Sequence, residues 1–303
     1  MVTLKRPDGN LPEDFHLSRR GVAGAIFARY AVAAFSAEAE PIHTDEAGLV
    51  TETTQLATAD GNHIRGYVAR PKAPGRFPAV IVVNEVFGLH AYILDTCRRF
   101  AKLGYVALAP GFFDRAGDPA PLPMAQVDQI RKIVATANDQ QVMSDVGVAL
   151  KFLESQPYVE RRKIAITGFC WGGKVVWNAC ETYPDLKAGV AWYGQMAPIG
   201  PAQPSDPAHP RLWPVEHAAE LKAPVLGLYG GKDPLSQAAP AMEAALKAAG
   251  KAGSSIHVYP DAGHGFHADY RDSYVEADAK DGWSELLAFY AANGVAPRAY
   301  TAA

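Results

Sequence analysis

From about residue 49 onward, short apolar runs alternate with segments in which apolar residues recur at helical spacing. Pro78–Val83 and Tyr105–Ala109 are continuous apolar runs of strand length, as expected for strands buried on both faces of a sheet. Helical spacing is clearest for a group of four apolar residues, Val142, Val146, Leu150 and Leu153. The alternation predicts an α/β fold with a mostly parallel central sheet and helices on both faces.

The two ends of this region have their own patterns. Val50–Thr58 and His63–Arg70 flank an Asp-Gly turn, which predicts an N-terminal hairpin. A helix that ends at Gly104 and an amphipathic helix near the C-terminus are also expected. The remaining predicted strands are Lys163–Thr167, Ala188–Tyr193, Val225–Tyr229 and Ser255–Tyr259.

The chain of 303 residues is long enough for one large core. We expect an N-terminal extension over residues 1–44, a single domain over 45–297 and a C-terminal tail over 298–303. Within the extension, Ser18-Arg19-Arg20 precedes the small-apolar stretch Gly21–Ala37, which resembles a twin-arginine export signal. An attached amphipathic helix is the alternative, so a periplasmic and a cytoplasmic location both stay open.

Charge and cysteine content narrow the function classes. The net charge is −3 and no dense Lys/Arg cluster occurs, so a nucleic-acid partner is not expected. The sequence contains no run of about 18 apolar residues, so no membrane-spanning helix is predicted. The chain has only three cysteines, a small and odd number that does not fit a disulfide framework. A small neutral or weakly anionic molecule is the expected partner, bound by a monomer or a small homo-oligomer.

The strand Lys163–Thr167 runs directly into Gly168–Gly173, with the sequence Gly-Phe-Cys-Trp-Gly-Gly, and then into a helix. A nucleophile on such a tight strand-to-helix turn needs glycines beside it, because side chains there would collide. The helix that follows would favour a thiolate at Cys170, and the Trp171 amide would supply half of an oxyanion hole. The alternative is that Cys170 is only a small buried apolar residue.

A cysteine nucleophile needs a base and an orienting carboxylate. Of nine histidines, His264 lies in a glycine-flanked loop after the last predicted strand, where it could take the thiol proton. Asp233 follows an earlier strand and could hold the histidine, although an Asp-Pro pair is also a common helix N-cap. His267 lies three residues after His264, but no further ligands complete a metal site, so neither a metal nor a cofactor is expected.

The chain order of nucleophile, acid and histidine is that of α/β-hydrolases. Across roughly residues 49 to 292 the three motifs together resemble the dienelactone hydrolase family, the carboxymethylenebutenolidases and their relatives. The resemblance implies that Glu85, in the segment Asn84–Gly88, assists deprotonation of the thiol when substrate binds. It also implies that the Val86 amide is the second oxyanion donor.

The resemblance further implies an arginine for the substrate's carboxylate, and Arg115 is similar in position to it. Tyr193, at the end of a predicted strand, is a second candidate for substrate binding. The family's second carboxylate-binding arginine would fall four residues after the histidine, where this chain has Ala268. Arg271 is nearby, but the sequence does not place its side chain.

We therefore expect a hydrolase that cleaves a small ester or lactone through an acyl-enzyme thioester. The catalytic residues would be Cys170, His264, Asp233 and Glu85. Two alternatives stay open: a non-catalytic protein of the same fold that binds a small ligand, and a redox protein that uses the Cys170 thiol. The separation of ten residues along a helix makes a disulfide between Cys170 and Cys180 impossible.

Overall fold

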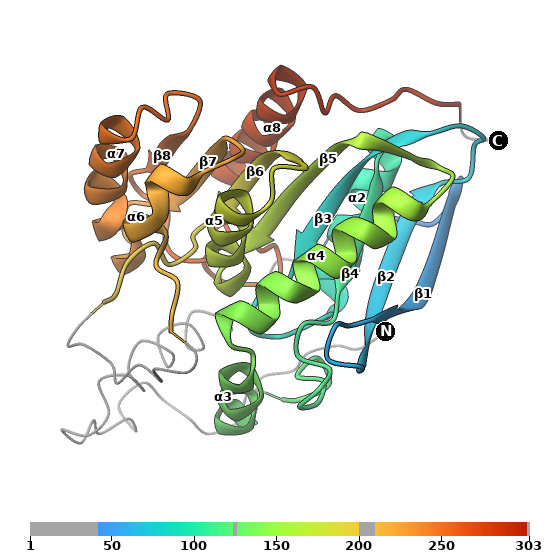
Figure 1. Ribbon diagram of the computed structural model, residues 1–303, viewed down its shortest axis with the longest axis horizontal. Helices are drawn as coiled ribbons and strands as arrows, with labels where there is room; N and C mark the ends of the chain where they lie inside the picture. The colour runs from blue at the N-terminus through green and yellow to red at the C-terminus, as the bar shows by residue number, and fades with distance from the viewer. Residues whose placement is uncertain (1–41, 124–125, 200–209, 302–303) are drawn as a thin grey trace.

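The computed structural model describes residues 42–123, 126–199 and 210–301, arranged as one sheet covered by helices (Figure 1). The stretch predicted as an export signal or attached helix lies outside the described residues. Among the described residues, no helix is long and apolar enough to cross a membrane.

Eight strands form the sheet in the order β1-β2-β4-β3-β5-β6-β7-β8. The hairpin β1–β2 is antiparallel, β2 pairs antiparallel with β4, and all pairs from β4 to β8 are parallel. The predicted mostly parallel sheet with an N-terminal hairpin is therefore confirmed. The strands are β1 Leu49–Ala57, β2 His63–Pro71, β3 Phe77–Val83, β4 Val106–Pro110, β5 Val159–Phe169, β6 Leu186–Trp192, β7 Val225–Gly230 and β8 Ser255–Tyr259.

Helices cover both faces of this sheet, also as predicted (Figure 1). Helices α3, α4, α5 and α7 pack on one face, and α2 and α8 pack on the other. The longer helices are α2 Ala91–Leu103, α3 Val127–Thr136, α4 Asp139–Ser155, α5 Trp171–Thr182, α7 Ala239–Ala248 and α8 Glu276–Ala292. Short helical turns are α6 Pro214–His217, η3 Ala218–Glu220 and η4 Pro234–Ala238.

The alternation of side chains along each central strand divides the core into two layers. On β3, Ile81 and Val83 belong to the layer under α4 and α5, whereas Val80 and Val82 belong to the layer under α2 and α8. All seven residues of β3 are buried, which explains why its sequence is a continuous apolar run. The sequence therefore encodes a central strand that is covered on both sides.

The observed elements differ from the predicted ones at a few points. Helix α3 was not predicted, because only three of its residues are buried and its apolar stripe is short. Strand β5 begins at Val159, four residues before the predicted start, because its exposed polar residues at 160–163 still have strand geometry. Gly104 is confirmed as the cap of α2, with a φ of 96°.

The parallel arrangement brings the carboxyl ends of β3, β5, β6, β7 and β8 to one edge of the sheet. Open α/β sheets bind ligands at this edge. Each of these strands is followed, within five residues, by a candidate site residue: Glu85, Cys170, Tyr193, Asp233 and His264.

Candidate active site

Cys170 occupies the turn between β5 and α5 in a backbone conformation that side chains rarely adopt, with φ 57° and ψ −116°. The neighbouring glycines make this turn sterically feasible. A Cβ on Gly168 would lie 2.3 Å from the Gly172 carbonyl oxygen, and one on Gly172 would lie 2.6 Å from the Val83 carbonyl oxygen. The glycine spacing in the sequence therefore has the steric cause expected for a strained nucleophile turn.

Asp233 and His264 form a hydrogen-bonded pair at the same edge of the sheet. The distance between Asp233 Oδ2 and His264 Nδ1 is 2.7 Å; the Asp233 side chain is buried, and that of His264 is 9% exposed. The other carboxylate oxygen, Oδ1, accepts a hydrogen bond of 3.0 Å from the Leu235 amide at the start of η4. Asp233 is thus an N-cap residue and the partner of His264 at once, so the two interpretations of this residue are compatible.

Tyr193 directly follows β6, the strand between β5, which precedes Cys170, and β7, which precedes Asp233. Its backbone has φ 40°, and its ring packs edge-on against His264 with a centroid distance of 5.0 Å. The tyrosine is fully buried, and its hydroxyl has no hydrogen-bond partner among the described residues. A buried hydroxyl left without a partner is costly, so this atom is suited to bind a ligand.

Cys170 is 1% exposed, and burial raises the pKa of its thiol well above the ordinary value. The negative charges of Glu85 and Asp233 raise this pKa further, whereas Arg271 and the Trp171 amide lower it. The resting thiol is therefore neutral, and its surroundings are charged rather than purely apolar. A neutral thiol must lose its proton to a base before it can attack a carbonyl.

Glu85 is fully buried beside Cys170 and makes three polar contacts. Arg271 Nη2 donates a hydrogen bond of 2.7 Å to Oε1, Tyr270 donates its hydroxyl to Oε2, and His90 Nε2 lies 3.5 Å from Oε2. Burial alone would raise the pKa of Glu85, but Arg271, His90 and Tyr270 outweigh it and lower this pKa to about 2. Glu85 is therefore ionised and firmly held.

Sequence reasoning missed the partners of Glu85. Arg271 was noted without a position, and neither Tyr270 nor His90 was singled out. Tyr270 and Arg271 lie 185 and 186 residues after Glu85, and no motif spacing connects residues so far apart. The available signal in the sequence was that Tyr270 and Arg271 lie within ten residues of His264, the candidate histidine.

Arg271 has further capacity for hydrogen bonding. Its side chain is 0% exposed, yet its Nη1 atom has no hydrogen-bond partner among the described residues. Its guanidinium also lies over the Tyr270 ring, at 5.4 Å from the centroid. A buried guanidinium with an unused Nη1 amino group, close enough to interact electrostatically with Cys170, is suited to an oxygen of a bound molecule.

The two predicted oxyanion donors lie on neighbouring segments. The start of α5 approaches the loop after β3 so closely that a Cβ on Gly172 would lie 2.7 Å from the Asn84 carbonyl oxygen. Trp171 follows Cys170 in the first turn of α5, and Val86 follows Glu85 in that loop. The Val86 amide donates no hydrogen bond to any of the described residues. The Trp171 amide thus interacts with the Cys170 thiol, and the Val86 amide lies in the loop that the start of α5 approaches.

Arg115 is held in a different environment. Its guanidinium donates to both carboxylate oxygens of Asp145, at 2.7 and 2.8 Å, and to both of Asp60, at 2.7 and 3.2 Å. These contacts use all three of its nitrogen atoms and join the β1–β2 turn to α4. A role in substrate binding stays a prediction for Arg115, and it would require these ion pairs to open.

His267 lies in a different environment from His264. His267 is 4% exposed, its Nδ1 atom lies 2.5 Å from the Tyr92 hydroxyl, and its ring packs against Trp192 and Trp283. Burial lowers the pKa of His267 to about 3, so it is neutral. Neither histidine belongs to the group of described residues whose geometry suits a metal ion.

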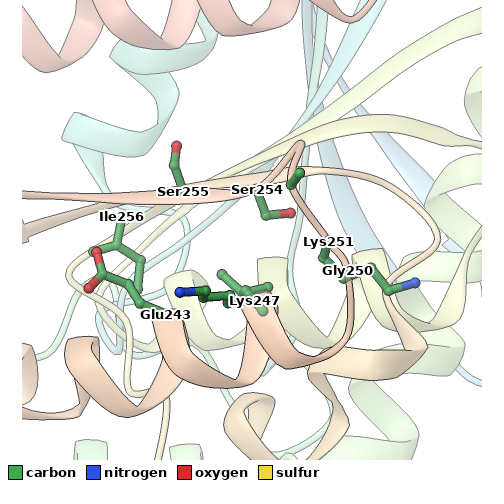
Figure 2. Close-up of a pocket in the computed structure, with 9 residues that line it drawn as sticks. Glu243, Lys247, Gly250, Lys251, Ser254, Ser255 and Ile256 are labelled. Atoms are coloured by element: carbon green, nitrogen blue, oxygen red, sulfur yellow. The ribbon is translucent and has the colours of Figure 1, made fainter.

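A surface groove of about 360 Å³ lies elsewhere on the molecule, between α7 and β8 (Figure 2). Ser255 and Ile256, which line it, begin strand β8, whereas His264 follows the end of that strand. The groove is thus at the amino end of β8, away from the catalytic candidates. Its lining residues are Glu243, Leu246, Lys247, Gly250, Lys251, Ala252, Ser254, Ser255 and Ile256.

The sheet order, the covering helices and the nucleophile turn together define an α/β-hydrolase. Comparison with known proteins makes the assignment more specific, because residues 64–293 match the model of the family described as "Dienelactone hydrolase family". The chain belongs to this family and is a dienelactone hydrolase-like hydrolase.

Individual relatives cover most of the chain. A protein of Methylorubrum extorquens named "Putative carboxymethylenebutenolidase" is 43% identical over 92% of this chain and 94% of its own length. A Bradyrhizobium protein named "Probable 2-oxo-3-(5-oxofuran-2-ylidene)propanoate lactonase" is 30% identical over 80% of this chain and 96% of its own. The crystal structure of a "Putative Dienelactone Hydrolase" from Klebsiella pneumoniae has 40% identity and a TM-score of 0.72, and the match covers 80% of this chain and 98% of that one.

Proposed function

We propose that this hydrolase cleaves a small ester or lactone through a Cys170–His264–Asp233 triad and an acyl-enzyme thioester. The observation that carries the proposal is the 2.7 Å contact between Asp233 and His264 at the sheet edge where Cys170 occupies a strained turn. The names of the relatives, which include a carboxymethylenebutenolidase and a lactonase, support an ester or lactone as the substrate.

In the proposed reaction, His264 Nε2 takes the thiol proton as Cys170 Sγ attacks the carbonyl carbon. Asp233 holds the imidazole through Nδ1 and stabilises the positive charge that the ring gains. The tetrahedral intermediate then expels the alkoxide, which receives that proton from His264. A water molecule, deprotonated by His264, attacks the thioester, and the thiol is regenerated as the carboxylic acid leaves.

The oxyanion of each tetrahedral intermediate would be held by two backbone amides, those of Trp171 and Val86. Donors of this kind are already in place before the reaction, so they cost little reorganisation when charge develops. The close approach of α5 to the loop after β3 supports this pairing, as does the Val86 amide that donates to none of the described residues.

Glu85 would take part only after substrate has bound. At rest its carboxylate has a pKa of about 2 and the thiol has a raised pKa, so proton transfer from Cys170 to Glu85 is strongly unfavourable. A substrate oxygen that binds Arg271 would weaken the hold of Arg271 on Glu85 and raise the pKa of Glu85. Deprotonation of the thiol would then become easier when substrate is present.

Arg271 and Tyr193 are the residues that we assign to substrate binding. Each offers a buried polar atom without a hydrogen-bond partner among the described residues, Nη1 of Arg271 and the hydroxyl of Tyr193. These atoms suit the carboxylate or carbonyl oxygens of a small acid ester or lactone. Arg115, whose nitrogen atoms are all bound by carboxylates, would contribute less.

The test is hydrolysis of a short-chain p-nitrophenyl ester and of a dienelactone by the wild type, Cys170→Ala and His264→Ala. Loss of turnover of about 10³-fold or more in both variants is expected. Unchanged turnover in both would reject the triad. Peroxide-dependent thiol chemistry without esterase turnover would favour the redox alternative. All three cysteines are free and buried, which argues against that alternative.

A further inference from the structure

A second group of potential ligands lies between β8 and α8. His257 is on β8, and Asp281 and Glu285 are one turn apart on α8. One ligand atom from each residue lies within 4.8 Å of the others. The imidazole Nδ1 is 2.5 Å from Glu285 Oε1, and all three side chains are at least partly exposed.

Neighbouring side chains hold this group in position. The His257 ring stacks on Tyr259 with a centroid distance of 4.2 Å and an interplanar angle of 21°. The Tyr259 hydroxyl donates a hydrogen bond of 3.0 Å to Asp281 Oδ2. Metal ligands in proteins are commonly oriented by such second contacts, which fix the ring and leave one carboxylate oxygen available.

The surroundings of the group are negatively charged. Asp281 and Glu285 form no ion pair with a lysine or arginine within the described part of the chain. Asp278, three residues before Asp281 on α8, adds a further carboxylate. A divalent cation would neutralise this local excess of negative charge.

We propose that His257, Asp281 and Glu285 bind a divalent transition-metal ion, for which Zn²⁺ is the probe. One imidazole nitrogen and two carboxylate oxygens match the ligand preferences of such ions, whereas Ca²⁺ and Mg²⁺ prefer oxygen ligands alone. Three protein ligands leave a position for water. The site is separate from the catalytic residues and does not depend on the proposed function.

Binding requires only small side-chain movements. Ligand atoms about 2.0–2.2 Å from a zinc ion are at most about 4.4 Å apart, slightly less than the present limit of 4.8 Å.

The consequence of binding is mechanical. Strand β8 is at the edge of the sheet, and Tyr259–Asp281 and His257–Glu285 are polar contacts that join it to α8. An ion shared by both elements would fasten this edge strand. Strand β8 leads directly into the loop that carries His264, so the ion would stabilise the element that precedes this loop.

Isothermal titration of the full chain with Zn²⁺ at pH 7.5 tests the proposal, with thermal unfolding as a second measurement. We expect one ion bound with a micromolar dissociation constant and at least a tenfold loss of affinity in His257→Gln, Asp281→Asn and Glu285→Gln. The melting temperature should rise by several degrees with Zn²⁺ and not with Ca²⁺.

Glu276→Gln is the matched control, because Glu276 is an exposed carboxylate on the same helix that pairs with Lys280 instead. It should bind Zn²⁺ like the wild type. Equal affinity in the wild type and all three ligand variants would overturn the proposal, since the ion would then bind elsewhere, for example at Cys170 and His264. Absence of binding to the wild type at 1 mM Zn²⁺ would overturn it as well.

Discussion

Asp233 and Glu85 are both buried carboxylates that act electrostatically on Cys170, but they are bound by different sets of groups. Asp233 binds a histidine and a backbone amide, whereas Glu85 binds a guanidinium, a tyrosine hydroxyl and a histidine. In the proposed mechanism, the first arrangement keeps His264 oriented as a base at all times. The second keeps a carboxylate ionised and occupied until something competes for Arg271.

Asp233 and Glu85 are both buried, but their different partners predict different effects when each residue is replaced. Replacement of Asp233 should damage the chemical step, because His264 loses the acceptor that fixes its tautomer. Replacement of Glu85 should damage both stability and activity, because a buried cation loses its counter-charge.

The largest effect is expected for Asp233→Asn. We predict a fall in kcat of about 10³- to 10⁴-fold with little change in KM, because an asparagine amide can donate to Nδ1 and favour the wrong tautomer. Steady-state kinetics with a p-nitrophenyl ester provide the measurement. A fall of less than tenfold would remove Asp233 from the triad.

Glu85→Gln should have a smaller effect on activity, about 10²-fold in kcat, but a large effect on stability. Leaving Arg271 buried without a counter-charge should lower the free energy of unfolding by about 3–5 kcal/mol. Urea denaturation measures this loss, and the double variant Glu85→Gln/Arg271→Met should recover much of it. Stability equal to that of the wild type would show that the ion pair contributes nothing to the fold.

Arg271 and Arg115 provide a matched pair for substrate binding. Arg271→Lys keeps the charge but loses the planar fork, so KM for an ester that carries a carboxylate should rise about tenfold or more relative to its neutral analogue. Arg115→Lys should change this ratio less than threefold, because the Arg115 nitrogen atoms already contact Asp60 and Asp145. The reverse result would assign carboxylate binding to Arg115.

The smallest effect on catalysis is expected for His267, which should instead affect stability at acid pH. Its native pKa of about 3 lies below the ordinary value of 6.5, so the unfolded state binds more protons between these two pH values. Stability should therefore fall as the pH is lowered through this window, by about 5 kcal/mol. In His267→Gln, which is less stable at pH 7, the stability should depend less on pH. An unchanged slope would show that another group causes the loss.

The sequence predicted most of the fold because each central element carries a local signal. The apolar run of β3, the glycines around Cys170 and the Asp-Gly turn of the hairpin each reflect a steric or packing requirement within a few residues. Helix α3 carried no comparable signal, since few of its residues are buried.

The site divides in the same way. Cys170, Asp233 and His264 lie in short glycine-rich loops whose spacing can be read from the sequence. The cluster of Glu85, Tyr270 and Arg271 is formed by tertiary contacts over about 185 residues, so no local pattern could reveal it. The metal-ligand group on β8 and α8 was missed for the same reason, because His257 and its two carboxylates are 24 and 28 residues apart.

In the proposed mechanism, Cys170 carries the acyl group during turnover. Rapid acid quench of the enzyme with a short-chain p-nitrophenyl ester, followed by intact and peptide mass spectrometry, tests it directly. We predict the mass of one acyl group on the peptide that contains Cys170, with no label in Cys170→Ala. Full turnover by Cys170→Ala, or an acyl group found only on another residue, would contradict the account.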